Sequence, residues 1–177
     1  MGELSDFWKE KKVFITGHTG FKGSWLSLIL LKHGAKVKGY SKDGFEKGSF
    51  YDSLKLCDDI ESIKGDITDY SSLEREVSIF SPDIIFHLAA QPLVLESYSD
   101  PRGTFSTNVM GTLNVLEVSR SVESVKSIIS VTTDKVYKNN EWDYSYREID
   151  SLGGYDPYSA SKASGDILTN SYKQSFF

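Results

Sequence analysis

The chain has 177 residues, of which 39% are hydrophobic and 25% are charged. These values are typical of a globular domain with a single core, and they exclude a disordered, fibrous or membrane-spanning chain. Because 20 lysines and arginines face 25 aspartates and glutamates, for a net charge of −5, no basic surface is expected that would attract a nucleic acid.

Short apolar segments alternate with longer segments of helical spacing along the chain. In order, the pattern predicts a strand at residues 13–15, a helix at 24–33, strands at 37–40 and 62–67, a helix at 71–80, a strand at 83–90, a helix at 104–120, a strand at 127–132 and a helix that includes 158–173. Such alternation forms right-handed βαβ units. The sequence therefore predicts an α/β fold, a doubly wound parallel sheet of the Rossmann type with helices on both faces.

Two further expectations concern the helix at 104–120 and the loops. Phe105, Val109, Leu113 and Leu116 form an apolar stripe that is expected to pack on the sheet or on another helix. Residues 42–59 are predicted to form a long loop with one short helix, and residues 138–155 an irregular loop. A long loop between a strand and a helix is usually functional or mobile.

A glycine-rich turn lies between the first strand and the first helix. Glycines at positions 17, 20 and 23 permit a tight turn and a close approach of a pyrophosphate to the helix N-terminus. Three glycines also suit an ordinary turn, but the strand before them and the helix after them favour a dinucleotide. His18 in this turn is a candidate contact of the cofactor or of a phosphate, and an exposed turn histidine is the alternative.

The ends of the next two strands bear on the choice of dinucleotide. An acidic residue at the end of the second strand usually holds the ribose hydroxyls, but Tyr40, Ser41 and Lys42 occupy this place. Lys42 could accept a phosphate or be a solvated loop charge, so the residues alone leave NAD and NADP open. Asp66, after the third strand, could bind the adenine amino group or simply cap the loop.

The fourth strand ends in small residues. Leu88, Ala89, Ala90 and Gln91 follow His87, and side chains of this size would let a cofactor lie against the backbone. Small residues at a strand end are also common in ordinary packing. This run therefore adds support to the dinucleotide site predicted from the glycine turn, but it does not predict such a site by itself.

Tyr158 and Lys162 lie four residues apart on the last predicted helix and therefore share one face. An ammonium group about 5 Å from a phenol favours the phenolate by roughly 3 kcal/mol at an effective dielectric near 20. A tyrosine in this setting can act as a base near neutral pH. The spacing also arises by chance on helix surfaces, but here it follows a nucleotide-type glycine turn.

Cysteine content and the chain start indicate the compartment. Cys57 is the single cysteine, so neither an internal disulfide nor a cysteine cluster for zinc is expected, no metal site is predicted, and the cytoplasm is the expected location. The charged N-terminus carries no apolar core with a cleavage site, so no signal peptide is predicted. The longest apolar run, residues 28–31, is too short to cross a bilayer.

From about Lys12 onward the sequence resembles the extended short-chain dehydrogenase/reductase superfamily and, within it, the CDP-glucose 4,6-dehydratases. The most specific runs are GHTGFKG at 17–23, HLAAQP at 87–92, TNVMGT at 107–112, TTDK at 132–135 and GGYDPYSASK at 153–162. The resemblance implies NAD as cofactor and a catalytic set of Thr133, Asp134, Lys135, Tyr158 and Lys162. The implied cofactor-binding set is Gly17, His18, Thr19, Gly20, Phe21, Lys22, Gly23, Asp66, Ile67, Leu88, Ala89, Ala90, Gln91, Asn108, Tyr158 and Lys162.

The superfamily pattern also implies roles for these residues. Thr133 hydrogen-bonds the sugar 4-oxygen, Tyr158 is the base, and Lys162 tunes the tyrosine and binds the ribose. In the dehydratase branch, the C4 hydride passes to NAD, water leaves from C6 after C5 has become acidic, and the hydride returns to C6. Related dehydratases carry an acidic pair at positions 134 and 135, one acid for the leaving hydroxyl and one base for C5.

Lys135 departs from this pattern because it stands in the position of the base. It would act either as an amine deprotonated by a dry site or as a cation that stabilises the enolate. A plain salt bridge between Asp134 and Lys135 at the strand end is the third interpretation. Val136 stands where many members of this group are expected to carry a cysteine.

Length is the larger departure, because family members continue through further strands and a C-terminal portion that grips the nucleotide and the sugar. Residues 1–177 are therefore predicted to be a dinucleotide-binding domain without its substrate portion. An epimerase or reductase of the same superfamily, or a non-catalytic NAD-binding module, are the alternatives.

The expected partners follow from the resemblance as well. They are a nucleotide-sugar substrate, CDP-glucose, whose product supplies surface polysaccharide, and a second copy of the chain. The helices at 104–120 and 158–173 are predicted to pair with their copies in a homodimer. Neither a nucleic acid nor a membrane is expected as a partner.

Overall fold

The computed structural model describes residues 6–177. Five strands form one parallel sheet in the order β3-β2-β1-β4-β5. They are β1 (Lys12–Thr16), β2 (Lys36–Ser41), β3 (Glu61–Lys64), β4 (Ile84–His87) and β5 (Ser127–Ser130). This order confirms the predicted doubly wound α/β fold. The expectations that rest on the first five residues and on the side chain of Cys57 lie outside the described part.

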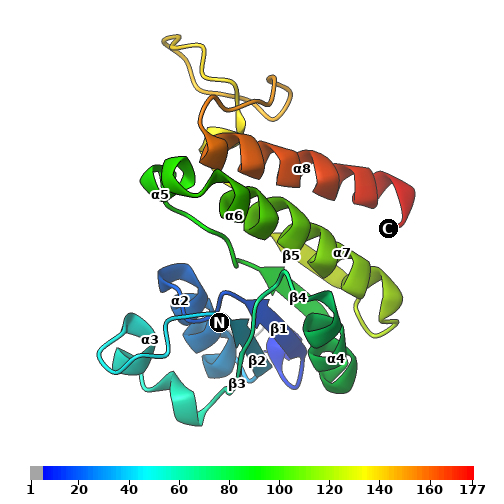
Figure 1. Ribbon diagram of the computed structural model, residues 1–177. Coiled ribbons are helices and arrows are strands. Elements are labelled where there is room, and N and C mark those ends of the chain that lie inside the picture. Colours follow the sequence, from blue (N-terminus) through cyan, green and yellow to red (C-terminus); the bar gives the residue numbers. More distant parts are fainter. Residues whose placement is uncertain (1–5) are drawn as a thin grey trace.

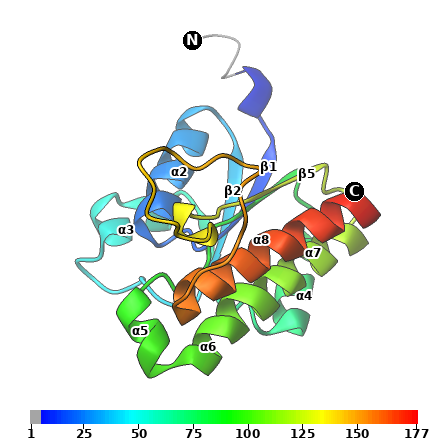
Figure 2. The same cartoon turned by 90° about the horizontal axis from the view of Figure 1, so that it is seen from above.

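Helices cover both faces of the sheet. They are α2 (Phe21–Lys32), α3 (Phe50–Ser53), α4 (Tyr70–Phe80), α5 (Val94–Ser99), α6 (Pro101–Phe105), α7 (Gly111–Ser121) and α8 (Pro157–Ser175), with short 3₁₀ turns η1 (Leu56–Asp58) and η3 (Asp134–Val136). One π-helical turn, η2 (Ser106–Met110), joins α6 to α7. In both views α8 runs alongside α6 and α7, and α2 and α3 lie away from them (Figures 1 and 2).

Strand β1 lies in the middle of the sheet and is covered on both faces. Val13 and Ile15 pack with Leu30 of α2 in one core cluster. Phe14 packs on the opposite face with residues of α4 and α7. All three β1 side chains have no exposed surface, which explains why this strand is continuously apolar rather than alternating.

Several element boundaries differ from the sequence-based expectation. Helix α2 begins at Phe21 rather than Ser24, because Gly20 takes the extended conformation of an N-cap, so Gly23 lies inside the first turn. Strands β3, β4 and β5 end two or three residues earlier than expected, where the chain leaves the sheet toward the site. Residues 42–59 contain α3 and η1, and the loop at 138–155 is irregular apart from its end, where Leu152 forms an isolated bridge with Tyr137.

The apolar stripe predicted on residues 104–120 is only partly correct. Leu116 is buried, but Phe105 is 38% exposed, and the inward face lies one residue to the side and carries Thr104, Asn108 and Thr112. These buried polar groups bond to one another and to neighbouring loops, so they satisfy the requirement that buried polar atoms be paired. Counting apolar residues alone could not reveal this polar face.

Candidate functional site

A cleft of about 740 Å³ lies at the carboxyl ends of the strands. The loops that follow all five strands contribute to its wall, together with η2 and α8. The lining residues are Gly17, Thr19, Gly20, Phe21, Lys22, Gly23, Tyr40, Ser41, Lys42, Asp43, Gly44, Gly65, Asp66, Ile67, Leu88, Ala89, Ala90, Gln91, Pro92, Leu93, Glu96, Thr107, Val131, Thr132, Tyr158 and Lys162. This is the place where open parallel sheets bind ligands, because the chain connections diverge between β1 and β4.

The glycine turn closes the cleft floor by direct backbone packing. Gly17 has a φ of +75°, and a Cβ there would lie 2.6 Å from the Ala89 nitrogen. A Cβ on Gly23 would lie 2.2 Å from the Gly17 carbonyl oxygen. Both positions therefore require glycine, and the helix N-terminus behind them is left open to an anionic group.

The His18 side chain is not part of this opening. It is fully buried, and its ring nitrogens lie 2.9 Å from Ser41 Oγ and 3.1 Å from Ser62 Oγ. Burial lowers the pKa of His18 to about 4, so the ring is neutral near pH 7. The expectation that this side chain contacts a cofactor or phosphate is not supported, and the exposed alternative is wrong as well, because the ring anchors the turn to β2 and β3.

An ion pair lies at the β2 and β3 end of the cleft. Lys42 Nζ lies 3.0 Å from Asp66 Oδ2, and Asp66 Oδ1 accepts hydrogen bonds from Thr68 N (2.9 Å) and Thr68 Oγ1 (2.8 Å). Burial opposes ionisation of Asp66, but the Thr68 and Lys42 contacts outweigh it and lower the pKa of this carboxyl. Lys42 is therefore a solvated loop charge, with its side chain 68% exposed, that is paired with Asp66.

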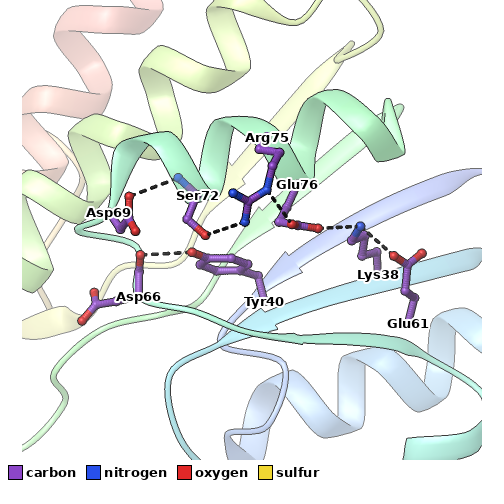
Figure 3. A network of polar contacts seen from close by, with 8 residues as sticks. All are labelled: Lys38, Tyr40, Glu61, Asp66, Asp69, Ser72, Arg75 and Glu76. Atoms are coloured by element: carbon purple, nitrogen blue, oxygen red, sulfur yellow. Dashed lines mark hydrogen bonds and ion pairs between the residues drawn. The ribbon is translucent and has the colours of Figure 1, made fainter.

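A polar network beneath this end holds Asp66 in place (Figure 3). Tyr40, whose side chain is fully buried, donates its hydroxyl to the Asp66 carbonyl oxygen at 3.2 Å. Nearby, the buried Lys38 ammonium lies 2.7 Å from Glu61 and 3.0 Å from Glu76, which ties β2 to β3 and α4. The Asp66 carboxylate points away from this network in Figure 3, so it stays available at the cleft.

The turn after β4 is held at both of its ends. Thr16 Oγ1 accepts a hydrogen bond from Ala89 N at 3.2 Å. Asn108, whose side chain is buried, accepts from Gln91 N at 2.8 Å and donates to the Gln91 carbonyl at 3.1 Å. Asn108 does not line the cleft; it holds a segment that does.

Helix α8 brings Tyr158 and Lys162 to the same cleft wall. Asp156 caps this helix by accepting a hydrogen bond from Ser159 N at 2.9 Å, which fixes the first turn. Lys162 Nζ donates to the Val131 carbonyl at 2.9 Å. Burial lowers the pKa of Lys162, and the Lys22 cation adds to this shift.

The structure places the TTDK run, residues 132–135, at the rim. Thr132 lines the cleft, whereas Thr133, Asp134 and Lys135 do not. Thr133 Oγ1 donates to Asp134 Oδ1 at 3.0 Å, and Asp134 and Lys135 are exposed. The Asp134–Lys135 salt bridge, the third interpretation of this run, is not among the ion pairs of the described residues.

Two lining residues from helices were not among the predicted site residues. Glu96 reaches the cleft from α5 and belongs to none of the motifs, whereas Thr107 reaches it from η2 and is the first residue of the TNVMGT run. Among the side chains that the structure describes, no group of three histidine, cysteine or acidic residues is arranged to hold a metal ion. Within residues 6–177 no helix has the length and apolar character needed to cross a bilayer.

Known proteins are similar to this chain in sequence and in fold. The CDP-glucose 4,6-dehydratase of Salmonella typhimurium is 49% identical over 172 residues, which cover 97% of this chain and 48% of that relative. The dTDP-glucose 4,6-dehydratase of Streptomyces venezuelae, solved with NAD bound, superposes with a TM-score of 0.79 at 28% identity, over 93% of this chain and 52% of that one. For the UDP-glucose 4-epimerase of Thermus thermophilus in complex with NAD, the TM-score is 0.83 at 28% identity, with coverage of 93% and 51%.

The chain spans about half the length of the curated relatives it matches. The family model described as GDP-mannose 4,6 dehydratase matches residues 14–176, which run from β1 to the end of α8 and include the whole cleft. The chain therefore belongs to the GDP-mannose 4,6-dehydratase family.

Proposed function

We propose that this chain is the NAD-binding domain of a sugar-nucleotide 4,6-dehydratase that converts CDP-glucose into CDP-4-keto-6-deoxyglucose. One observation carries the proposal: Tyr158 and Lys162 line the same cleft as the glycine turn. The choice of CDP rests on the 49% identity to the Salmonella typhimurium enzyme, because the relatives of other nucleotide specificity in the comparison are 29% to 32% identical.

The cleft has the features that a dinucleotide requires. Its volume of about 740 Å³ lies in the range of small-molecule and cofactor sites. Gly17 and Gly23 let the turn pack closely on its own backbone and on the β4 turn, which leaves the start of α2 at the cleft for a pyrophosphate. Lys22 and Lys162 supply positive charge among the lining residues. When bound, NAD would supply a reversible acceptor for one hydride, and the residues of this chain would supply binding and proton transfer.

In this reaction Tyr158 removes the proton from the sugar 4-hydroxyl. Lys162, which is held against the Val131 carbonyl, lines the same cleft wall as Tyr158 and would bind the cofactor ribose. Thr133 is one residue from the cleft lining and donates to the sugar 4-oxygen once its hydroxyl turns from Asp134. These three groups orient the sugar so that its C4 hydrogen faces the cofactor.

Asp134 and Lys135 carry the elimination. Asp134 protonates the hydroxyl that leaves from C6 as water, solvent at this exposed rim takes up the C5 proton, and Lys135 stabilises the negative charge that develops on the sugar. When the hydride returns to C6, solvent gives a proton back to C5. Lys135 is exposed at the rim of the cleft, and stabilisation of the developing charge is the role proposed for it.

The experiment uses the complete protein that carries these residues. Incubation with CDP-glucose and a catalytic amount of NAD should give a 4-keto-6-deoxy sugar without net NADH, detected by NMR. Tyr158→Phe should lower the rate by about 10²–10⁴-fold while NAD remains bound, and Tyr155→Phe on the exposed loop is the matched control. A folded protein that retains NAD and gives no keto sugar contradicts the proposal.

A 4-epimerase is the second candidate, because the Thermus thermophilus epimerase has the higher of the two TM-scores given above and the elimination residues lie outside the cleft. The two functions differ in product. An epimerase returns a sugar inverted at C4 that keeps its 6-hydroxyl, whereas a dehydratase loses that hydroxyl. A protein that binds NAD and converts no sugar nucleotide would instead be a non-catalytic module.

The proposal includes an assembly and a compartment. Two copies would pair through α7 and α8 in a cytoplasmic homodimer whose product serves surface polysaccharide synthesis. Two exposed apolar side chains support the pairing, since Met110, directly before α7, is 49% exposed and Ile167 of α8 is 58% exposed. Sedimentation of the complete protein as a monomer would contradict the homodimer.

A further inference from the structure

His87, at the end of β4, is buried and bonds through both ring nitrogens. Nδ1 lies 2.7 Å from Thr16 Oγ1, and Nε2 lies 3.0 Å from Thr112 Oγ1. The ring therefore bridges β1 on one side and α7 on the other. No role has been given to His87 or Thr112 in the chemistry above.

The partners of the two threonines fix the tautomer of the ring. Thr112 has one hydroxyl proton, which it donates to the Asn108 carbonyl at 2.7 Å, so Nε2 of His87 must carry a proton and donate to Thr112. Burial, with a smaller contribution from the Lys162 charge, lowers the pKa of His87 to about 3. The ring is thus neutral, and Nδ1 accepts the hydroxyl proton of Thr16.

Both ends of this bridge continue to the cleft wall, the Thr16 end directly and the Thr112 end by way of Asn108. On one side, Thr16 Oγ1 accepts the hydrogen bond from Ala89 N. On the other side, Asn108 clamps the Gln91 backbone and donates to Ser161 Oγ at 2.9 Å. Donors and acceptors match one to one through the bridge, as a buried polar network requires for stability.

The same network continues into helix α8. Ser161 Oγ donates to the Tyr158 carbonyl at 2.7 Å. The His87 carbonyl accepts a hydrogen bond from Val131 N at 3.0 Å, and the Val131 carbonyl is the acceptor of Lys162. Both cleft-lining residues of α8 are therefore linked to His87, Tyr158 by way of Thr112, Asn108 and Ser161 and Lys162 by way of the Val131 backbone.

We propose that His87 is a positioning residue that holds the cofactor-facing turn at residues 89–91 and the Tyr158 helix at a fixed separation. The inference rests on the proposed function for the role of Tyr158. A neutral imidazole suits this task, since its two nitrogens point in opposite directions and one donates while the other accepts. A shift of either wall by a fraction of an ångström would misplace the phenol relative to the cofactor.

The test cuts the network on each side separately, in the complete protein. Thr112→Val removes the hydroxyl at nearly constant volume, and Thr112→Ser keeps it and is the matched control. We expect Thr112→Val to lower kcat at least tenfold with the KM for the sugar nucleotide within twofold, and Thr112→Ser to stay within twofold in both. Thr16→Val should raise the Kd of NAD about tenfold, measured by fluorescence titration, whereas Thr16→Ser should not.

The outcomes separate a positioning role from a merely structural one. Equal loss of kcat in Thr112→Val and Thr112→Ser would show that packing, not the hydroxyl, matters and would overturn the inference, as would unchanged kinetics in both valine variants. If Thr112→Val does not fold, the Thr16 pair decides by NAD affinity alone. That readout also stands if the wild-type protein fails to convert CDP-glucose, in which case only the proposed function fails.

A spectroscopic measurement tests the tautomer directly. The ¹⁵N shifts of His87 in the wild-type protein should show a protonated Nε2 and an unprotonated Nδ1 at pH 7. A proton on Nδ1 would contradict the hydrogen-bond assignment and with it the inference.

Discussion

The chain ends β4 and β5 at the same edge of the sheet, but it holds the two strand ends in different ways. After β4, hydrogen bonds to Thr16 and Asn108 fix the turn across long stretches of sequence. After β5, Thr133 bonds to its neighbours Asp134 and Lys135, and both neighbours are exposed. Long-range hydrogen bonds thus fix the proposed cofactor wall, whereas the hydrogen bonds at the proposed elimination residues join neighbours in the sequence.

Because of this difference, substitutions at the two strand ends should have different effects on the stability of the fold and on the reaction. Substitutions at the β4 end disturb buried polar groups and backbone contacts, so they should cost folding free energy as well as cofactor affinity. Substitutions in the run after β5 disturb exposed groups, so they should change the reaction and leave the free energy of unfolding almost unchanged. The four predictions below test this division, in order of decreasing expected effect.

Mild acid should destabilise the protein through its two buried histidines, one in the turn after β1 and one at the end of β4. His18 and His87 have pKa values of about 4 and 3 when folded, below the unfolded value of about 6.5, so the unfolded state binds more protons below pH 6.5. Each ring should cost about 2 kcal/mol of unfolding free energy between pH 7 and pH 5, or about 4 kcal/mol together. Urea titrations at pH 8, 7, 6 and 5 check this; a flat profile from pH 7 to 5 would contradict it.

Gly17→Ala should destabilise the protein by about 3 kcal/mol, because the new Cβ meets the Ala89 backbone and φ is positive. Gly48→Ala is the matched control. Its φ of +86° is similar, but the space around it is open, so only the backbone term of about 1 kcal/mol remains. Denaturant unfolding measures both, and equal losses would show that contact with the β4 turn is unimportant.

Asp134→Asn should lower the rate of keto-sugar formation on the order of 100-fold, since the amide cannot donate a proton to the leaving hydroxyl. The free energy of unfolding should change by less than about 0.5 kcal/mol, because the side chain is exposed. Asp143→Asn, in the following loop, is the control for a lost surface charge. An unaffected rate would favour the epimerase, and a large loss of stability would contradict the division drawn above.

The smallest effect is expected at the Lys42–Asp66 pair, a contact between the segments that follow β2 and β3. Asp66→Asn frees the Lys42 ammonium and should shift the ratio of the NADP and NAD dissociation constants about tenfold toward NADP. Lys42→Ala should shift it in the opposite direction. Fluorescence titrations measure both, and shifts of the same sign would show that the pair does not set the charge at this end.

The sequence predicts the fold well, because strand and helix periodicity, the glycine turn and the final helix are all local patterns. It also places most of the cleft lining, since residues after parallel strands meet at one edge of the sheet. The role of His18 could not be found in this way, because its burial depends on Ser41 and Ser62, which are distant in sequence.

The inward face of residues 104–120 was missed for a related reason. Its groups are polar, and their partners are Gln91, His87 and Ser161, so no apolar period marks them. The bond between Thr133 and Asp134 likewise depends on rotamers that the sequence does not specify.

At the π-helical turn Ser106–Met110, a change in the number of residues should disturb the structure more than a change in their identity. An α-helix advances by about 100° per residue, so deleting one residue here would rotate everything that follows by more than a quarter turn. Thr112 would then leave the imidazole it now bonds to, although every remaining side chain would be the native one. Engineering of this segment should therefore proceed by substitution, and homologues aligned to it should show no gaps.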